Sequence, residues 1–261
     1  MQKIGIIGCG NLGLSLLKGI RKKEPKTILY GSKRNIESLK GLEDSVTFIT
    51  SNNKVVIEEC DVIILALKPY NTIPFLTENT TLFNSKKHSI VSVATGVTIS
   101  EIEACFSEPM DIFRAMPNTA SSVNESITMI AVSSDTLDRK DKIVSIFNTV
   151  GDTIIIEESL MESATVLGAC GIAYVLRFMR AMIQGGIEIG FDAKTATKIV
   201  SQTVKGAAEL IIRNGSHPEE EIDKVTTPKG CTIVGLNEME HSGFSSALIK
   251  GIVTSYQKIE K

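Results

Sequence analysis

The sequence predicts an α/β protein with a doubly wound, mostly parallel β-sheet in its N-terminal part and an all-α domain after it. Short β-branched runs alternate with helical patterns over residues 1–157, and a glycine-rich turn follows the first run. Strand-like runs then stop, and only helical spacing of apolar residues continues over residues 158–261. We therefore expect two domains, at 1–157 and 158–261.

The first strand and the turn after it predict a dinucleotide-binding loop. The apolar run Ile4–Ile7 leads directly into Gly8, Gly10 and Gly13 at G-x-G-x-x-G spacing, and a helical pattern follows. In such a Rossmann-type loop, the first glycine permits a tight turn and the second lets the backbone approach a pyrophosphate. The third lets the helix pack closely on its strand, with its free N–H groups facing the phosphate. A glycine turn without a ligand is the alternative.

The second strand predicts which dinucleotide binds. Thr27–Tyr30 reads as this strand, and Ser32, Lys33 and Arg34 follow it, with no acidic residue before Glu37. A ribose with a free 2′-hydroxyl usually meets an Asp or Glu about 20 residues past the glycines. A hydroxyl and two cations instead suit a 2′-phosphate. The pattern favours NADPH, with NADH possible but weaker, and a solvated turn is the alternative reading.

The remaining strands predict where a ligand binds. Several are apolar without alternation, as expected of strands covered on both faces, so ligands should lie beyond their carboxyl ends. Those ends hold Lys68-Pro69, Ala94-Thr95-Gly96 and Met116-Pro117-Asn118. The predicted strands are Val62–Leu67, Ser89–Ala94, Ile112–Met116, Ile127–Val132 and Thr153–Ile156.

The second half predicts a helical dimerisation domain. One helix should run from Ser159 to about Phe191, and a second from an N-cap at Asp192 to a stop at Gly215. A short third helix should begin at Pro218, and two more should follow a break at Thr226–Gly230. Glycines inside these helical patterns suggest a close approach of either another helix or a ligand. About thirty apolar-rich helical residues are more than one small core could cover, so we expect a homodimer through this half.

Composition excludes several other classes. The formal net charge is −2, aromatic residues make up 5%, and the longest basic run, Arg21–Lys23, ends the first helix, all of which argues against nucleic acid. Five scattered cysteines and three separated histidines show no metal-ligand spacing, so we expect no metal. The longest unbroken apolar run, Val62–Leu67, is far short of a membrane span, and the first strand leaves no room for a signal peptide. We expect a cytoplasmic protein that does not bind membranes.

Several motifs in one order resemble the pyrroline-5-carboxylate reductase family over essentially the whole chain. The resemblance implies reduction of 1-pyrroline-5-carboxylate to L-proline by hydride transfer from NADPH. It also implies a helical domain that interlocks dimers, which often assemble into larger rings. Beyond the glycine loop, the motifs are Leu65–Pro69, Ser92–Ile99, Arg114–Thr119, Gly206–Ala208 and Val225–Thr232.

The resemblance also implies a set of cofactor-binding residues. Ser32 and Arg34, beside Lys33, would meet the 2′-phosphate, and Asn53 would lie beside the adenosine end. Lys68 would orient the cofactor or only pack along the strand end. The pyrophosphate would be held by Cys9, Gly10, Asn11 and Leu12, between Gly8 and Gly13. The nicotinamide ribose and ring would be lined by Ala66, Leu67, Lys68, Pro69, Ala94 and Thr95.

On the substrate side, the resemblance implies a carboxylate-binding loop of backbone N–H groups that includes Thr227, Gly230 and Cys231. Thr232 would be the catalytic residue and hydrogen-bond the substrate nitrogen, with a plain helix N-cap as the alternative. Glu158 would lie near the amino acid. Asn118 would contact the substrate or serve only as a turn residue.

Three departures from the family pattern concern the identity of the imine. Lys229 replaces the first of two glycines, Ala169–Tyr174 differs from Gly-Ser-Gly-Pro-Ala-Tyr, and Cys231 stands where Ala or Thr is frequent. Lys229 would add charge near a carboxylate or point to solvent. A paralogous reductase of another imine or ketone, and a non-catalytic dinucleotide sensor, are the alternative functions.

Overall fold

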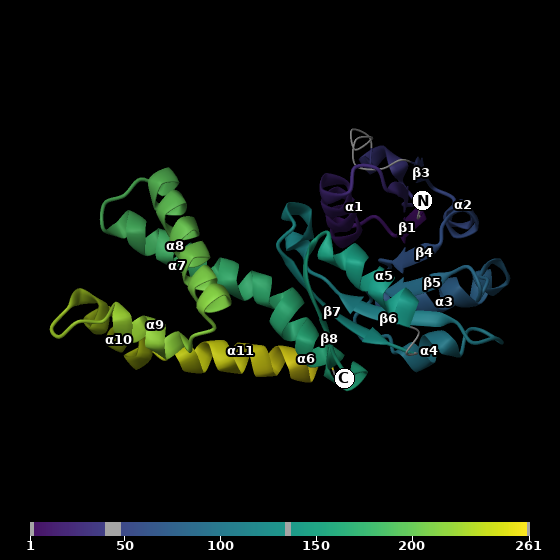
Figure 1. The fold of residues 1–261 in the computed structure, drawn as a ribbon. Coiled ribbons are helices and arrows are strands. Elements are labelled where there is room, and N and C mark those ends of the chain that lie inside the picture. Colours follow the sequence, from purple (N-terminus) through teal and green to yellow (C-terminus); the bar gives the residue numbers. More distant parts are fainter. Residues whose placement is uncertain (1–2, 40–47, 134–136, 260–261) are drawn as a thin grey trace. The chain divides into compact units, whose positions relative to one another are not determined.

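The computed structural model describes residues 3–39, 48–133 and 137–259 (Figure 1). The chain forms two compact units. The first extends to Cys170 and is rejoined by the chain from Tyr256, and the second comprises Gly171–Ser255. The first unit contains the sheet and the second is helical, so the predicted order of an α/β part and an all-α part is confirmed.

The first unit is built on one eight-stranded sheet in the order β3-β2-β1-β4-β5-β6-β7-β8. All neighbouring strands are parallel except β6 and β7, which pair antiparallel. The mostly parallel, doubly wound sheet was predicted correctly. The strands are β1 Lys3–Ile7, β2 Ile28–Ser32, β3 Phe48–Thr50, β4 Val62–Leu65, β5 Ser89–Ser92, β6 Asp111–Met116, β7 Ser126–Val132 and β8 Gly151–Ile155.

Three strands end earlier than the apolar pattern predicts, β4 and β5 by two residues and β8 by one, whereas β2 begins at Ile28 and extends two residues past its predicted end, to Ser32. Ladder pairing stops at Leu65 in β4 and at Ser92 in β5, so the apolar residues beyond them lie in loops. The short strand β3 was not predicted, because three residues are too few to establish a period. The prediction of strand ends was therefore wrong by two residues in β4 and β5, although both runs do form strands.

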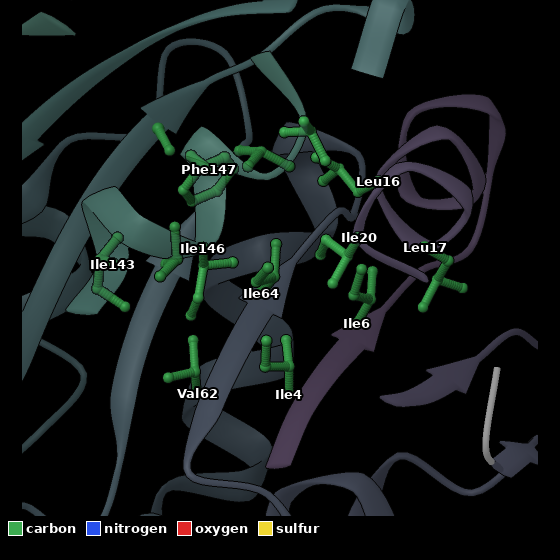
Figure 2. Packing of buried hydrophobic residues seen from close by; sticks show 14 of the residues in the cluster. Ile4, Ile6, Leu16, Leu17, Ile20, Val62, Ile64, Ile143, Ile146 and Phe147 are labelled. Atoms are coloured by element: carbon green, nitrogen blue, oxygen red, sulfur yellow. The ribbon is translucent and has the colours of Figure 1, made fainter. Parts of the chain in front are cut away.

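The side chains of the sheet alternate between two hydrophobic cores. Ile4 and Ile6 of β1 point toward one face, and Ile7 belongs to the cluster on the other. Figure 2 shows the first cluster, in which Leu16, Leu17 and Ile20 of α1 meet strand residues at helical spacing. Each such side chain contributes about 1.5–3 kcal/mol when fully buried. Helices therefore cover both faces, as the non-alternating strands predict.

Different helices of the first unit pack against the two faces of the sheet. Helices α1 and α5 supply residues to the first cluster, whereas α2, α3 and α4 supply residues to the second. The basic residues that end α1 lie in its last turn, as predicted. The helices are α1 Asn11–Lys23, α2 Asn53–Glu59, α3 Pro69–Asn79, α4 Ile99–Glu103 and α5 Leu137–Asn148, with single 3₁₀ turns at η1 Ile36–Leu39, η3 Thr80–Leu82, η4 Thr119–Val123 and η5 Glu158–Leu160.

The first long helix of the C-terminal half is interrupted, which differs from the regular helix predicted for Ser159 to Phe191. A π-helical segment, Thr165–Cys170, separates α6 (Met161–Ala164) from α7 (Gly171–Glu188). Within this segment Gly168 lies so close to β7 that a Cβ atom on it would be 2.4 Å from Cε of Met129. Local contacts with the sheet thus determine the backbone here, and periodicity alone does not reveal them.

The other helices follow the predicted boundaries. The Asp192 side chain accepts hydrogen bonds from the backbone N–H groups of Lys194 and Thr195, and Gly215 ends α8 with φ +63°. These are the predicted cap and stop. The remaining helices are α8 Ala193–Asn214, α9 Pro218–Lys224, α10 Cys231–His241 and α11 Phe244–Ile259, with the predicted break between α9 and α10.

Much apolar surface of the second unit is uncovered within one chain. Of the described residues in 171–255, only Ala196 and Val200 are buried hydrophobic residues. The helical run Glu158–Glu188 is long and apolar enough to cross a bilayer, yet only 6% of its most apolar window is buried. Such exposed apolar faces mark an interaction surface. Large exposed residues include Leu176, Ile189, Ile212, Val234 and Ile249.

Candidate functional site

The glycine loop adopts the tight turn that its sequence predicts. Gly8 has φ +95°, and a Cβ atom on it would lie 2.6 Å from the carbonyl oxygen of Ala66. A Cβ atom on Gly13 would lie 2.8 Å from the carbonyl oxygen of Gly8. Gly10, in contrast, has open space beside it, with the nearest atom 4.0 Å away. Gly8 and Gly13 are thus required by the fold, whereas Gly10 leaves room for a ligand.

The N-terminus of α1 is an anion-binding arrangement. Gly10 has no side chain to cap the helix, and no acidic residue lies in the first turn. The N–H groups of Asn11, Leu12 and Gly13 have no acceptor within the helix, as at any helix start. Together with the positive end of the helix dipole, they favour a phosphate group.

Cys9 is part of the scaffold of this loop. The backbone N–H groups of Gly8 and Cys9 donate to the carbonyl oxygen of Ser32, over 3.1 and 2.9 Å. This ties the glycine loop to the end of β2. Burial raises the pKa of the Cys9 thiol to about 12, so the thiol stays protonated and is not a nucleophile.

The end of β2 brings together two of the residues predicted to bind the adenosine end. The buried hydroxyl of Ser32 donates to Oδ1 of Asn53 over 2.7 Å, and Asn53 is the first residue of α2. Nδ2 of Asn53 has no hydrogen-bond partner among the described residues. Lys33 and Arg34 follow the end of this strand, and Lys33 is half-buried whereas Arg34 is exposed. Neither residue forms an ion pair with another described residue.

The other predicted cofactor residues lie at the carboxyl ends of β4 and β5. Strand β4 pairs with β1 and β5 pairs with β4, all in parallel, so their carboxyl ends lie at the same edge of the sheet as the glycine loop. The N–H of Ala66 donates to the carbonyl oxygen of Ile7 over 2.8 Å. Lys68 and Pro69 are exposed, Ala94 is buried and Thr95 is half-buried.

The structure adds an ion-pair network around a buried arginine, which the sequence pattern did not predict. The Arg114 side chain, 3% exposed, donates through Nη1 to Oε1 of Glu158 and through Nη2 to Oε1 of Glu162, over 2.9 Å in each case. Oε1 of Glu158 also accepts the backbone N–H of Ile99 over 2.7 Å. The sequence feature that could have indicated these ion pairs is an arginine within the apolar run Ile112–Met116. Its partners, however, lie 44 and 48 residues further along the chain.

Asn118 is held in a structural role. Its Oδ1 accepts the backbone N–H of Ala120 over 2.9 Å, and its Nδ2 donates to the carbonyl oxygen of Gly168 over 3.0 Å. The residue is 4% exposed. Both ends of the carboxamide are therefore used, and this geometry favours the turn-residue alternative over direct contact with a substrate.

The predicted substrate loop, within the second unit, precedes α10. The N–H of Gly230 donates to the carbonyl oxygen of Thr227 over 2.9 Å, and a Cβ atom on Gly230 would lie 2.6 Å from Oγ1 of Thr227. Gly230 gives α10 no side-chain cap, so the N–H groups of Cys231 and Thr232 begin the helix without acceptors in it. Such a helix start is suited to bind an anionic group, as at α1.

Thr232 and Lys229 occupy special positions in this loop. Thr232 is the second residue of α10, so the alternative prediction of an N-cap was wrong. The residue is half-buried, and its hydroxyl has no hydrogen-bond partner among the described residues. Lys229 has φ +59°, a conformation that glycine adopts more easily. This conformation would suit the glycine that the resemblance implies at this position.

No group of three or more potential metal ligands occurs among residues 3–39, 48–133 and 137–259. The candidate sites are instead two helix N-termini with adjoining polar side chains. Both are suited to bind anionic organic molecules.

Comparisons with known proteins match both halves of the chain. Residues 158–261 match the family model described as pyrroline-5-carboxylate reductase dimerisation, and residues 3–96 match the model described as NADP oxidoreductase, coenzyme F420-dependent. The chain is 41% identical, over 98% of its length, to Pyrroline-5-carboxylate reductase 1 of Dictyostelium discoideum, but spans only 49% of that relative.

Two further matches extend over nearly the full length of both proteins. The whole chain is 41% identical to Pyrroline-5-carboxylate reductase 2 of Dictyostelium discoideum and covers 93% of it. The crystal structure of Plasmodium falciparum pyrroline carboxylate reductase with NADP bound has a TM-score of 0.89 at 24% identity, and covers 99% of this chain and 97% of its own. This structural likeness concerns the fold.

Proposed function

The chain belongs to the pyrroline-5-carboxylate reductase family, and we propose that it reduces 1-pyrroline-5-carboxylate to L-proline with NADPH, the last step of proline synthesis. The observation that carries the proposal is the match at 41% identity along the whole chain to a relative of that name, of which the chain covers 93%. The match includes both helix N-termini described above, one for each partner in the reaction.

The residues around the glycine loop fit a dinucleotide. The open space beside Gly10 and the unpaired N–H groups of Asn11 and Leu12 suit the pyrophosphate. Arg34, with Lys33 and Nδ2 of Asn53, would bind the 2′-phosphate, so NADPH is preferred and NADH is a weaker donor. When bound, NADPH supplies the hydride, and the loops that carry Ala66–Pro69 and Ala94–Thr95 would line its nicotinamide end.

The loop before α10 would bind the imino acid. The backbone N–H groups of Cys231 and Thr232, behind Gly230 and Thr227, would hold the carboxylate without a charged side chain. The Thr232 hydroxyl, which has no other partner among described residues, would accept the N–H of the protonated imine and orient the ring. A cyclic imine is basic enough to bind partly protonated, so no strong general acid is needed.

The helical half mediates homo-oligomerisation, as the dimerisation family model over residues 158–261 indicates. We propose that the function divides at residue 157, with the dinucleotide bound by 1–157 and the substrate loop and dimer contacts supplied by 158–261. A second copy would cover the exposed apolar faces, and dimers would assemble further into rings. In this proposal Glu158–Glu188 lies in a protein interface and not in a bilayer, and the protein works in the cytoplasm.

The dimer proposal is tested by light scattering coupled to size exclusion, without detergent. A mass of two chains or a multiple of two is expected, and a detergent requirement for solubility would contradict it. Replacing Ile189, which is 79% exposed, by Glu should shift the protein toward the monomer.

The activity is tested by following NADPH oxidation with 1-pyrroline-5-carboxylate, NADH and a six-membered cyclic imine in parallel. Fast turnover of the five-membered imine with NADPH is expected. Preference for another imine would support the paralogous reductase, and tight NADPH binding without turnover of any imine would support a sensor.

A further inference from the structure

We propose that Arg114 is a positioning residue that holds Glu158 against the N-terminus of α4 and thereby fixes the loop Val93–Thr98 for hydride transfer. This loop joins β5 to α4 and carries Ala94 and Thr95, which are proposed to line the nicotinamide. The inference rests on the proposed function for its catalytic consequence, but its structural part can be tested without any turnover.

Arg114 is placed where its charge requires partners. It lies in β6, opposite Ser92 of β5, on the sheet face that packs against α4. Its residue exposure is 2%, and a guanidinium so deeply buried is unfavourable unless its charge and donors are matched. Glu158 and Glu162 each take one Nη group over 2.9 Å.

The two carboxylates differ in what else they contact. Oε1 of Glu158 accepts both Nη1 of Arg114 and the backbone N–H of Ile99, so one oxygen joins the strand to the helix. Ile99 is the first residue of α4, where the N–H has no acceptor in the helix. Among the described residues Glu162 has no hydrogen-bond or ion-pair partner other than Arg114, so it serves as a matched comparison.

The loop Val93–Thr98 is fixed at both ends. At its start, the N–H of Val93 donates to the carbonyl oxygen of Leu65 over 3.1 Å. At its end, Thr98 and Glu101 form a reciprocal capping box, and Glu158 adds the contact with Ile99 from 59 residues away. Of these anchors, the Glu158 contact is the one that depends on the side chain of Arg114.

Loss of this anchor should affect the chemical step more than cofactor affinity. A displacement of reacting groups by about 1 Å can lower a rate by about 100-fold. The pyrophosphate and 2′-phosphate are proposed to bind at the glycine loop and at the end of β2, on other strands of the sheet. A shift of the loop Val93–Thr98 should therefore leave most of the NADPH binding contacts in place.

The experiment compares Glu158→Ala with Glu162→Ala in the full-length protein. We expect Glu158→Ala to lower kcat at saturating substrate roughly 10-fold or more and to increase the primary deuterium isotope effect, with the NADPH Kd within about twofold of wild type. Glu162→Ala should keep kcat within about threefold. Equal loss in both variants, or a wild-type kcat in Glu158→Ala, would overturn the proposal.

A second variant links Arg114 to Glu158. Arg114→Lys keeps the charge but lacks the planar pair of Nη donors. If both residues act through one contact, the double variant Arg114→Lys/Glu158→Ala should lose no more kcat than the more damaged single variant. Losses that multiply would overturn the proposal. An effect on KM alone would also overturn it, because it would make Glu158 a substrate ligand only.

The anchor itself is tested by hydrogen exchange, which requires no turnover. Amides of residues 93–99 should exchange faster in Glu158→Ala than in wild type, but not in Glu162→Ala. Unchanged exchange in Glu158→Ala would overturn the anchor. A wild-type protein that reduces no imine, but shows the expected exchange pattern, would count against the proposed function and not against the anchor.

Discussion

The hydroxyl of Ser32, at the end of β2, donates a hydrogen bond to Oδ1 of Asn53 at the start of α2, over 2.7 Å. The two residues are 21 positions apart, and the sequence assigns them to the same cofactor without relating them to each other. Because Ser32 uses its hydroxyl proton here, it orients the Asn53 carboxamide, whose Nδ2 remains available. In the proposed complex, the donors left for a 2′-phosphate would therefore be Asn53, Lys33 and Arg34.

Arg34→Glu should reverse the cofactor preference. Replacing a guanidinium by a carboxylate removes a charge-assisted contact worth about 1.5–3 kcal/mol and adds repulsion of the 2′-phosphate. We expect the KM for NADPH to rise by about 10-fold or more, with a much smaller change for NADH. Steady-state kinetics with both cofactors measures this. Lys26→Glu, at an exposed cation away from the glycine loop, is the control, and equal effects on the two cofactors would refute the assignment.

Substitutions at two glycines of the first loop should affect protein stability and NADPH binding separately. Gly8→Ala places a Cβ atom 2.6 Å from a backbone oxygen at φ +95°, so it should lower the thermal midpoint strongly. Gly10→Ala meets nothing closer than 4.0 Å, so it should fold normally but weaken NADPH binding about 10-fold, because the Cβ atom occupies the space proposed for the pyrophosphate. Thermal unfolding and NADPH titration together test this, and unchanged affinity in Gly10→Ala would contradict the binding geometry.

Thr232→Ala should lower turnover about tenfold or more, because the hydroxyl is proposed to orient the imine nitrogen. Thr197→Ala, which removes a hydroxyl on α8 that donates to the carbonyl oxygen of Ala193, is the control. Wild-type turnover in Thr232→Ala would remove this residue from the mechanism.

Lys229→Gly should stabilise the loop before α10. A non-glycine residue at φ +59° carries about 1–2 kcal/mol of backbone strain, which the greater entropy of unfolded glycine offsets in part. We expect a gain of up to about 1 kcal/mol in the free energy of unfolding, measured in urea. The same variant decides the role of the charge, because a raised substrate KM that Lys229→Arg restores would place the cation near the carboxylate. A clear loss of stability would contradict the strain.

His88 should make stability pH-dependent. Burial lowers its pKa to about 4 from the ordinary 6.5, helped by the nearby charge of Lys87. Its Nδ1 accepts the N–H of Asn84 over 3.0 Å, and its Nε2 has no partner among the described residues. As the pH falls, His88 is protonated in the unfolded chain before it is protonated in the folded one. The free energy of unfolding is therefore unaffected by His88 above about pH 6.5 and falls by about 3 kcal/mol toward pH 4.

Urea unfolding at pH 7 and pH 4.5 measures this dependence. The loss between the two pH values should be clearly smaller in His88→Gln than in wild type. An equal loss in both proteins would exclude His88 as its origin.

The elements of the fold that have a local sequence signal could be predicted from the sequence. The apolar runs of β1, β4 and β5 and the cap and stop of α8 each have a signal within a few residues. The three-residue strand β3 and the π-helical segment around Gly168 do not, because pairing with β2 and contact with Met129 define them.

The candidate site was predictable to the same extent. The glycine loop is a local motif, so Gly8 and Gly13 could be assigned from spacing alone. Arg114 could not, because its role depends on Glu158 and Glu162, far along the chain, and on burial that no pattern in β6 reveals. The conformation of Lys229 likewise depends on how the loop enters α10.

The central claim is hydride transfer from NADPH to a five-membered cyclic imine, and isotope transfer tests it most directly. The purified protein would be given 1-pyrroline-5-carboxylate and NADPH deuterated at C4, in separate reactions for the two faces. We predict that one of the two yields L-proline one mass unit heavier, with deuterium on the ring carbon that was part of the C=N bond. Bound NADPH with no proline formed, or unlabelled proline from both reactions, would contradict the account.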